Sequence, residues 1–340
     1  MFRMFLLCAA LLAAPPVPAW EGRTMGTFYA VRLAGAPQKP EQTQALRTAV
    51  EKRFDELNRQ MSHYLPDSEL ARFNASASTA PYKVSAACAG VMRQALELHR
   101  ATEGAFEPTL GALINLWGFG PAGPRTTKPT DDQLAAARAQ CGANHLRVTP
   151  QAELQKDVPG LQLNLGGLAK GYAADEAARV LRKHGCANFF VSVGGEVVAC
   201  GVNDAGRPWQ VGIERPLYGA APGAAVSAIV PLSGRALSTS GNSRQFFRAE
   251  DGRVYVHLLD PATGHPPQHT LASVTVIATN GLTADALATA LFVLGPDRGL
   301  RWVEAHPDVA ALFILRESAD CFRLVPSRRF PVFQALEKHD

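Results

Sequence analysis

Residues 161–175 read LQLNLGGLAKGYAAD, and this stretch decides how the chain folds around its candidate site. Residues 161–165 are strand-like and run into Gly166 and Gly167, after which a helix is expected over about 170–184. Paired glycines between a strand and a helix let the backbone approach a ligand closely, with free N–H and C=O groups facing it.

Lys170 is expected in the first turn of that helix, where the helix dipole favours anions and a lysine brings no benefit. A cation in this place is better used on a phosphate or on the charged edge of a cofactor. The alternative is a tight strand-to-helix turn with a solvated lysine, and the residues alone do not choose between the two interpretations.

Around this stretch, expected helices and strands alternate irregularly, and we see no internal repeat. Helical spacing of apolar residues, or alanine-rich composition, predicts helices over 40–59, 85–102, 131–141 and 284–294. β-Branched and apolar runs predict strands over 24–33, 189–198, 209–214, 225–232, 254–259, 272–279 and 310–316. This mixed order predicts an α+β fold with largely antiparallel sheet.

Two further segments combine glycines with polar residues. Residues 191–196, VSVGGE, place paired glycines at the end of a buried strand, which marks a sheet corner or a close approach to a ligand. Residues 236–244, ALSTSGNSR, crowd hydroxyl and amide groups around Gly241. That segment is either a phosphate-binding loop or a polar surface loop.

His257 is a candidate base. It opens the segment 257–264, HLLDPATG, in which Asp260 and Pro261 begin a strong turn signal. A lone histidine on a strand is usually structural. Beside a phosphate and a metal, however, its pKa lies close enough to neutral pH for proton transfer.

Asp285 and Thr289 are candidate metal ligands in the segment 283–291, TADALATAL. They are four residues apart, so they share one helix face among apolar neighbours. A buried carboxylate needs a partner, and one carboxylate, one hydroxyl and backbone carbonyls form a hard oxygen site that suits Mg²⁺. The alternative is that Asp285 caps the N-terminus of the helix.

The amino-acid composition argues against a disordered, nucleic-acid-binding or zinc-binding protein. Apolar residues make up 47% of the 340 residues and charged residues 19%, which favours a sizeable core over disorder. The net charge of +4 is small and shows no basic blocks, so no nucleic-acid binding is expected. None of the cysteines after residue 19 forms a CxxC pair, which argues against zinc and favours buried free thiols at Cys88, Cys141, Cys186, Cys200 and Cys321.

Residues 1–19, MFRMFLLCAALLAAPPVPA, have the pattern of a secretory signal peptide. Arg3 precedes an apolar run that prolines interrupt, and the run is shorter than the roughly 20 residues that span a bilayer. We therefore expect export to the periplasm and a single domain over 20–340. Cys8 raises the alternative of a lipoprotein attached to the inner membrane, although no small residue directly precedes it.

Taken together and in order, these segments resemble the ApbE family of FAD:protein FMN transferases. The resemblance spans nearly the whole chain after residue 19. It rests on TMGTFYAV (24–31), MSHYLPDSELARFN (61–74), GAFEPTLGALINLWGFG (104–120), LNLGGLAKGYAADEAARVL (163–181), VSVGGEVVACG (191–201), ALSTSGNSRQFF (236–247), HLLDPATGHP (257–266), SVTVIA (273–278) and ADALATAL (284–291).

The resemblance implies a two-lobed, T-fold-related α+β fold with FAD held in a cleft between the lobes. It implies an enzyme that cleaves FAD with Mg²⁺, releases AMP and joins FMN by a phosphoester bond to a threonine or serine of another protein. The implied acceptors are flavoprotein subunits of membrane redox complexes that face away from the cytoplasm, which agrees with a signal peptide.

The same resemblance assigns site residues. It implies Mg²⁺ ligation by Asp285 and Thr289, with backbone carbonyls of Gly167 and Ala288 completing the set. His257 and Asp285 are the implied catalytic residues. Implied FAD contacts are Met25, Ser62, His63, Tyr64, Ala105, Phe106, Glu107, Asn164, Lys170, Ser240, His257 and Leu259.

Two positions depart from the family pattern, and two other functions compete with transfer. Asn164 stands where the family often has aspartate and cannot supply a negative charge, whereas Glu107 replaces a common aspartate with a longer arm. One rival function is a Mg²⁺-dependent FAD pyrophosphatase that gives FMN and AMP. The other is a periplasmic flavin-binding accessory protein without catalytic activity.

Overall fold

The computed structural model of the protein describes residues 19–35, 39–125, 127–221, 223–249 and 252–336. The expected signal peptide over 1–19 lies outside these residues except for Ala19. Within the described ranges, no helix has both the length and the hydropathy that crossing a bilayer requires.

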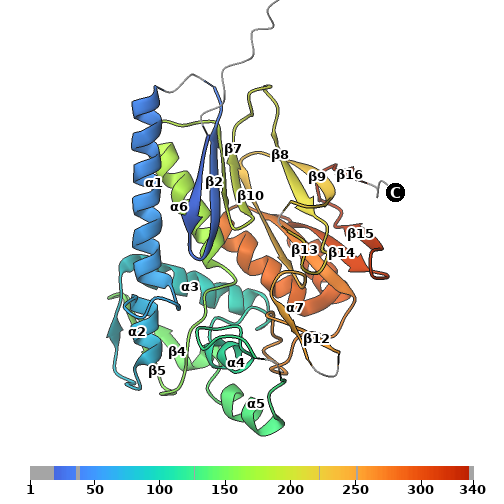
Figure 1. Ribbon diagram of the computed structural model, residues 1–340. Helices are drawn as coiled ribbons and strands as arrows, with labels where there is room; N and C mark the ends of the chain where they lie inside the picture. The colour runs from blue at the N-terminus through green and yellow to red at the C-terminus, as the bar shows by residue number, and fades with distance from the viewer. Residues whose placement is uncertain (1–18, 36–38, 126, 222, 250–251, 337–340) are drawn as a thin grey trace, which may run out of the picture.

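A large antiparallel sheet forms the centre of the molecule (Figure 1). Every neighbouring pair of its strands runs antiparallel. In spatial order the strands are β1 (Ala19–Thr24), β2 (Thr27–Leu33), β6 (Phe189–Val193), β7 (Glu196–Cys200), β10 (Arg235–Gly241), β13 (Leu271–Ala278), β14 (Ala310–Arg316) and β15 (Phe322–Pro326). The expected α+β fold with mainly antiparallel sheet is confirmed.

Both faces of this sheet are covered, because side chains alternate between two cores along each strand. In β13, Val274 and Val276 belong to the core on the helical side, whereas Ile277 belongs to the opposite core. Because both faces of β13 are covered, every residue of this strand is buried, including the small hydroxyl residues Ser273 and Thr275.

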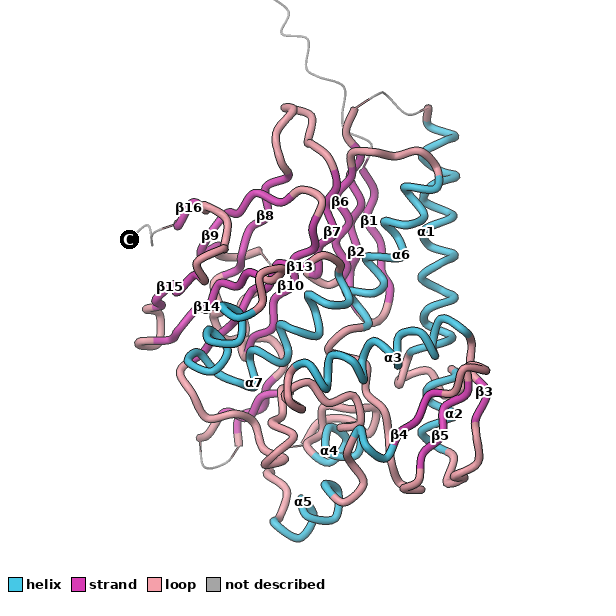
Figure 2. Tube along the Cα trace, turned by 180° about the vertical axis from the view of Figure 1, so that it is seen from behind, coloured by secondary structure: helices cyan, strands magenta, loops and turns pink. Residues whose placement is uncertain are grey.

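Helices cover one face, with α6 and α7 in front of the strands and α1 at their flank in Figure 2. Their sequences carry the expected apolar stripes: Leu46, Val50, Phe54 and Leu57 of α1 are all buried. The helices are α1 (Pro40–Met61), α2 (Glu69–Ala75), α3 (Ala86–Ala101), α4 (Gly111–Leu116), α5 (Asp131–Arg138), the 3-10 turn Ala143–His145, α6 (Ala169–Lys183) and α7 (Gly281–Ala305), which kinks at Gly295.

Three small sheets complete the described fold. A sheet of β8 (Trp209–Glu214), β9 (Val226–Leu232) and β16 (Gln334–Ala335) contributes to the core on the face opposite the helices. The other two are formed by β3 (Tyr82–Lys83), β5 (Glu153–Lys156) and β4 (Leu146–Val148), and by β11 (Phe246–Arg248) with β12 (Val254–Val256).

The expected strand over 161–165 is wrong. Its leucines do alternate inward, but Asn74 occupies the backbone groups that a ladder would use: its amide oxygen accepts from Leu163 N at 2.8 Å and its amide nitrogen donates to Leu163 O at 2.8 Å. Only an isolated bridge joins Gln162 to Leu110. The segment is therefore extended without belonging to a sheet.

Two other local predictions need correction. The segment 236–244 is not a loop for most of its length, because it forms the central strand β10, where the small hydroxyl residue Ser238 is fully buried. The single strand expected over 24–33 is a hairpin instead, because Met25 (φ 50°) and Gly26 (φ 71°) form a left-handed two-residue turn between β1 and β2.

The five cysteines within the described residues are free thiols, and their exposure varies. Cys88 is buried as expected, whereas Cys321 is exposed. Burial raises the pKa of Cys88 to about 12, which makes that thiol inert at neutral pH.

Candidate functional site

The site is built where the first turns of α6 and α7 cross. Gly171 of α6 and Gly281 of α7 face each other so closely that a Cβ on either would overlap the carbonyl oxygen of the other. A Cβ on Gly171 would also lie 2.8 Å from the Cβ of Asp285. Only glycine permits this approach, and the approach brings the residues beside Gly171 to the α7 face that carries Asp285.

Asp285 is 2% exposed, and its carboxylate turns toward α6. Its Oδ2 accepts a hydrogen bond of 3.0 Å from the backbone N–H of Gly171. Asp285 does not cap its own helix, since the α7 N-cap is Asn280, whose side chain accepts from Thr283 N. The alternative that Asp285 caps its own helix is therefore wrong; the carboxylate instead accepts from the first turn of α6, which occupies one of its oxygens.

Lys170 stands between two carboxylates. Its Nζ lies 3.0 Å from Glu196 Oε1 and 3.7 Å from Asp285 Oδ2, and it donates to the backbone oxygen of Gly166 at 3.2 Å. Burial alone would lower the pKa of Lys170, but the charges of Asp285 and Glu196 outweigh it and hold the pKa above its usual range. Lys170 is therefore a fixed positive charge, not a solvated surface lysine.

Hydroxyl and backbone groups adjoin Asp285 along the same helix face. Thr289 Oγ1 lies 3.4 Å from Ser240 Oγ of β10. Gly167 packs directly on Thr289, since a Cβ there would lie 2.7 Å from Thr289 Oγ1. The structure thus brings together Gly167, Lys170, Ser240, Asp285 and Thr289, from three separate sequence segments.

This donor set fits a hard divalent cation. Oxygen atoms of a carboxylate, two hydroxyls and the backbone suit Mg²⁺, which takes few protein ligands and keeps waters or phosphate oxygens in the remaining positions. Across the described ranges, no cluster of three or more His, Cys, Asp or Glu side chains is arranged to hold a metal.

His257 follows β12 and is half-buried, and its surroundings favour the neutral imidazole. Burial lowers its pKa to about 4, helped by the positive charge of Lys170, while the backbone contact to Gln245 opposes the shift. Its Nδ1 lies 3.2 Å from the carbonyl oxygen of Gln245, which can only accept a hydrogen bond. That contact fixes the proton on Nδ1 and leaves Nε2 as the basic nitrogen.

A polar and aromatic rim continues from Asn164. The Asn164 side chain accepts from Gly166 N at 2.8 Å and lies 3.5 Å from His63 Nε2. Tyr64 stacks obliquely on His63 and donates to the carbonyl oxygen of Phe119, whose ring meets His257 edge-on at 6.3 Å. Asn164 therefore serves as a backbone-ordering amide, a role that needs no carboxylate.

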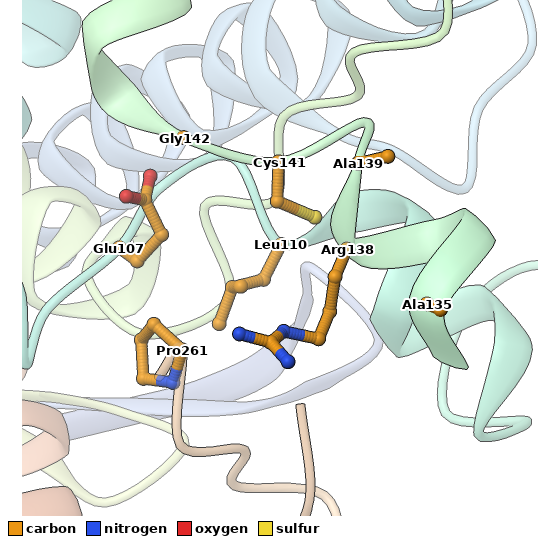
Figure 3. Close-up of a pocket in the computed structure, with 8 residues that line it drawn as sticks. All are labelled: Glu107, Leu110, Ala135, Arg138, Ala139, Cys141, Gly142 and Pro261. Atoms are coloured by element: carbon orange, nitrogen blue, oxygen red, sulfur yellow. The ribbon is translucent and has the colours of Figure 1, made fainter. Parts of the chain in front are cut away.

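Glu107 lies beside a neighbouring pocket of about 490 Å³, shown in Figure 3. Its carboxylate is directed toward the backbone near Gly142, where Oε2 accepts from Ala143 N at 3.1 Å, while Oε1 accepts from Thr109. Arg138 closes another side of the pocket and donates to the carbonyl oxygen of Ala262. In this structure Glu107 orders loops, and its contact with FAD stays a prediction.

The other implied FAD contacts remain predictions with defined positions. Met25 lies in the β1–β2 turn, and Ser62 Oγ accepts from the backbone N–H groups of Tyr64 and Leu65. The remaining implied FAD contacts are buried in the cores that flank the site: Ala105, Phe106 and Leu259. Ala288, whose backbone carbonyl is an implied Mg²⁺ ligand, is buried in α7.

Sequence reasoning missed two acidic residues of the site. Asp175 accepts from the backbone N–H groups of Gly281 and Leu282 at 2.7 and 2.9 Å, so it caps α7 from the neighbouring helix. Glu196 pairs with Lys170 and is 4% exposed. The sequence pattern could have identified Glu196, because a charged residue directly after paired glycines on a buried strand needs a buried partner.

Comparisons with curated proteins find relatives that match over nearly the whole chain. A curated relative from Klebsiella pneumoniae (strain 342), named FAD:protein FMN transferase, is 38% identical over 99% of this chain and 99% of its own. The relative of the same name from Escherichia coli (strain K12) is 38% identical over 96% of this chain and 92% of its own.

Solved structures have a similar fold. The flavin transferase ApbE from Vibrio cholerae superposes with a TM-score of 0.82 at 37% identity, covering 93% of this chain and 99% of that one. The apo form of the Pseudomonas stutzeri flavinyl transferase ApbE gives a TM-score of 0.81 at 36% identity, with 92% and 95% covered. The ApbE family profile itself matches residues 25–313. By sequence and by fold, this chain belongs to the ApbE family.

Proposed function

We propose that this protein is a Mg²⁺-dependent FAD:protein FMN transferase. It cleaves the diphosphate of FAD, releases AMP and leaves FMN in a phosphoester bond to a threonine or serine of a target protein. The observation that carries the proposal is the pairing of Asp285 and Thr289 on one buried helix face with Lys170 beside them. The names of the curated relatives support the same activity.

Phosphoryl transfer requires positioning and charge neutralisation more than covalent chemistry by the protein. Mg²⁺ held by Asp285, Thr289 and the backbone at Gly167 and Ala288 would neutralise charge that develops on the diphosphate. Lys170 adds a second positive charge, because its paired carboxylates keep it protonated. Asn164 holds the Gly166 backbone, so that the turn before α6 presents a fixed surface to the diphosphate.

His257 is the group that can accept the proton of the acceptor hydroxyl. As the threonine or serine oxygen forms its bond to the FMN phosphorus, its proton passes to His257 Nε2, and the bond between that phosphorus and the bridging oxygen of AMP breaks. The lowered pKa of about 4 keeps His257 neutral and ready at neutral pH. It also makes His257 a weak base, so its help comes late in the attack.

The acceptors we propose are flavoprotein subunits of membrane redox complexes outside the cytoplasm. The sequence pattern over 1–19 supports export to the periplasm, with attachment to the inner membrane through Cys8 as the alternative arrangement. An exported transferase and such acceptors would meet in the same compartment.

One incubation separates transfer from the two rival functions. The purified protein is mixed with FAD, Mg²⁺ and a candidate acceptor subunit, and the products are resolved on a denaturing gel and by chromatography. Flavin fluorescence that migrates with the acceptor, together with AMP, supports the transferase. Free FMN and AMP without labelled acceptor would show a pyrophosphatase, and unchanged FAD would show a binding protein.

The role of His257 has its own test in the same assay. We expect His257→Ala to slow acceptor labelling by about a hundredfold or more, which is the usual loss when a general base is removed. FAD binding, followed by fluorescence quenching, should change little. Labelling at the wild-type rate would remove His257 from the mechanism.

A further inference from the structure

Glu196 is a buried acid that contacts Lys170 and is assigned no direct contact with the metal, FAD or the acceptor. It begins β7, is 4% exposed, and contacts Lys170 through Oε1 at 3.0 Å. Its second oxygen, Oε2, is buried without a hydrogen-bond partner among the described residues. A carboxylate oxygen left unsatisfied in the interior is costly, so its retention calls for an explanation beyond packing.

The β6–β7 turn also guides the Lys170 side chain. Gly194 and Gly195 form the turn with positive φ values of 66° and 106°. A Cβ on Gly194 would lie 3.0 Å from Lys170 Cδ and 3.0 Å from Thr27 Cγ2, so the lysine stem runs along the bare backbone of the turn. The residue directly after this turn is Glu196, which then receives the ammonium group.

The two carboxylates around Lys170 are not equivalent. The ammonium lies 0.7 Å closer to Glu196 than to Asp285, from the distances of 3.0 and 3.7 Å. A lysine drawn fully onto Asp285 would compete with a divalent cation for the same carboxylate and would repel it at short range. The position of the ammonium therefore decides whether Asp285 can serve as a metal ligand.

We propose that Glu196 is a positioning residue that holds the Lys170 ammonium off Asp285, so that Asp285 stays open to a divalent cation. This inference rests on the proposed function and adds a residue to it. Glu196 acts through Lys170, without contacting the metal or the reacting phosphate. A purely structural ion pair would instead affect stability alone.

The test measures Mn²⁺ binding by the protein without FAD, followed as the loss of the free Mn²⁺ signal in electron paramagnetic resonance. Four proteins are compared: wild type, Glu196→Ala, Lys170→Met and the double variant. Lys170→Met keeps the length of the stem and removes its charge. We expect Glu196→Ala to weaken Mn²⁺ binding about tenfold when Lys170 is present, and less than about threefold in the Lys170→Met background, because the coupling runs through the lysine.

Two results would overturn the inference. Wild-type affinity in Glu196→Ala would show that Glu196 does not position Lys170, and an equal loss in both backgrounds would show that Glu196 ligates the cation itself. Thermal melting of each variant confirms that it is folded, and a folded Glu196→Ala variant with wild-type affinity counts against the inference.

A separate variant tests the proposed metal site itself, independently of Glu196. Asp285→Asn should abolish Mn²⁺ binding. If Asp285→Asn binds as wild type does, or wild type binds no Mn²⁺, the metal site at Asp285 is wrong and this inference falls with it.

Discussion

Two short segments of this chain share the pattern G-x-x-A-D, but their aspartates make different sets of hydrogen bonds. Residues 171–175 open α6 and residues 281–285 open α7, and each aspartate accepts backbone N–H bonds from the first turn of the other helix. Asp175 uses both oxygens on two α7 donors. In the described structure, the contacts of Asp285 with α6 all run through Oδ2.

The same helix contact can therefore place one aspartate, Asp175, as a helix cap and leave the other, Asp285, available as a proposed metal ligand. A carboxylate that accepts two backbone bonds is satisfied and contributes a helix cap. A carboxylate that accepts one bond keeps an oxygen for a ligand. Lys170 precedes Gly171, whereas the capping residue Asn280 precedes Gly281, so the positive charge lies on the side of Asp285.

The largest effect should come from Asp285→Asn. The amide can still accept from Gly171 N, so the fold should persist, but it lacks the charge that a cation needs. We expect transfer to fall by about a thousandfold, equivalent to roughly 4 kcal/mol of transition-state stabilisation. Acceptor labelling measures the rate, and circular dichroism checks the fold. Normal labelling by a folded variant would contradict the functional role.

Next is Gly281→Ala, which places a methyl group against the Gly171 carbonyl. Backbone cannot move away as a flexible side chain can, so we expect a loss of about 3 kcal/mol in the free energy of unfolding. The matched control is Gly90→Ala in α3, where an added Cβ meets nothing within 4 Å. That variant should be neutral or slightly stabilising. Equal stability of the two variants in urea would show that the close approach of Gly281 to Gly171 is not required.

Asp175→Asn should affect stability more than chemistry. It replaces one carboxylate acceptor of two N–H bonds with an amide that has a single acceptor oxygen, which should cost about 1–2 kcal/mol in the free energy of unfolding. Transfer per folded molecule should stay within a few-fold of wild type. A loss of labelling as large as that of Asp285→Asn would contradict the assignment of a structural role to Asp175 and a catalytic role to Asp285.

The smallest effect should come from Asn280→Ala. Its side chain accepts from Thr283 N, and Asp175 still caps the same helix end, so we expect about 0.5–1 kcal/mol of destabilisation in urea. Together with Asp175→Asn the loss should exceed the sum of the single losses, because the first turn of α7 then lacks both caps. Simple additivity would show that the caps act independently.

Periodic patterns predicted much of this fold, since α1, α3 and α6 and most central strands follow from the spacing of apolar residues. Local sequence patterns gave wrong secondary structure where a side chain distant in sequence takes the hydrogen bonds that a neighbouring strand would otherwise make. Residues 161–165 alternate like a strand, but Asn74 takes the hydrogen bonds. The polar segment 236–241 reads as a loop, although small hydroxyl residues such as Ser238 fit a strand buried on both faces.

Residue type and spacing predicted which candidate residues would lie together, but they did not reveal residues whose place in the site depends on long-range contacts. Asp285 and Thr289 share a face by their spacing alone, and the structure places Lys170 beside them. Asp175 and Glu196 gain their roles from partners more than 20 positions away in the chain, Gly281 and Lys170, which no local pattern reveals. The five-residue G-x-x-A-D repeat is too short to be noticed before its two copies are seen to touch.

The most direct test of the central claim is anomalous diffraction from crystals soaked with Mn²⁺ and FAD. We predict a Mn²⁺ peak within about 2.3 Å of an Asp285 carboxylate oxygen and of Thr289 Oγ1, with the diphosphate of FAD in contact with the ion. A peak at Asp175, or a diphosphate bound away from the α6–α7 crossing, would contradict it.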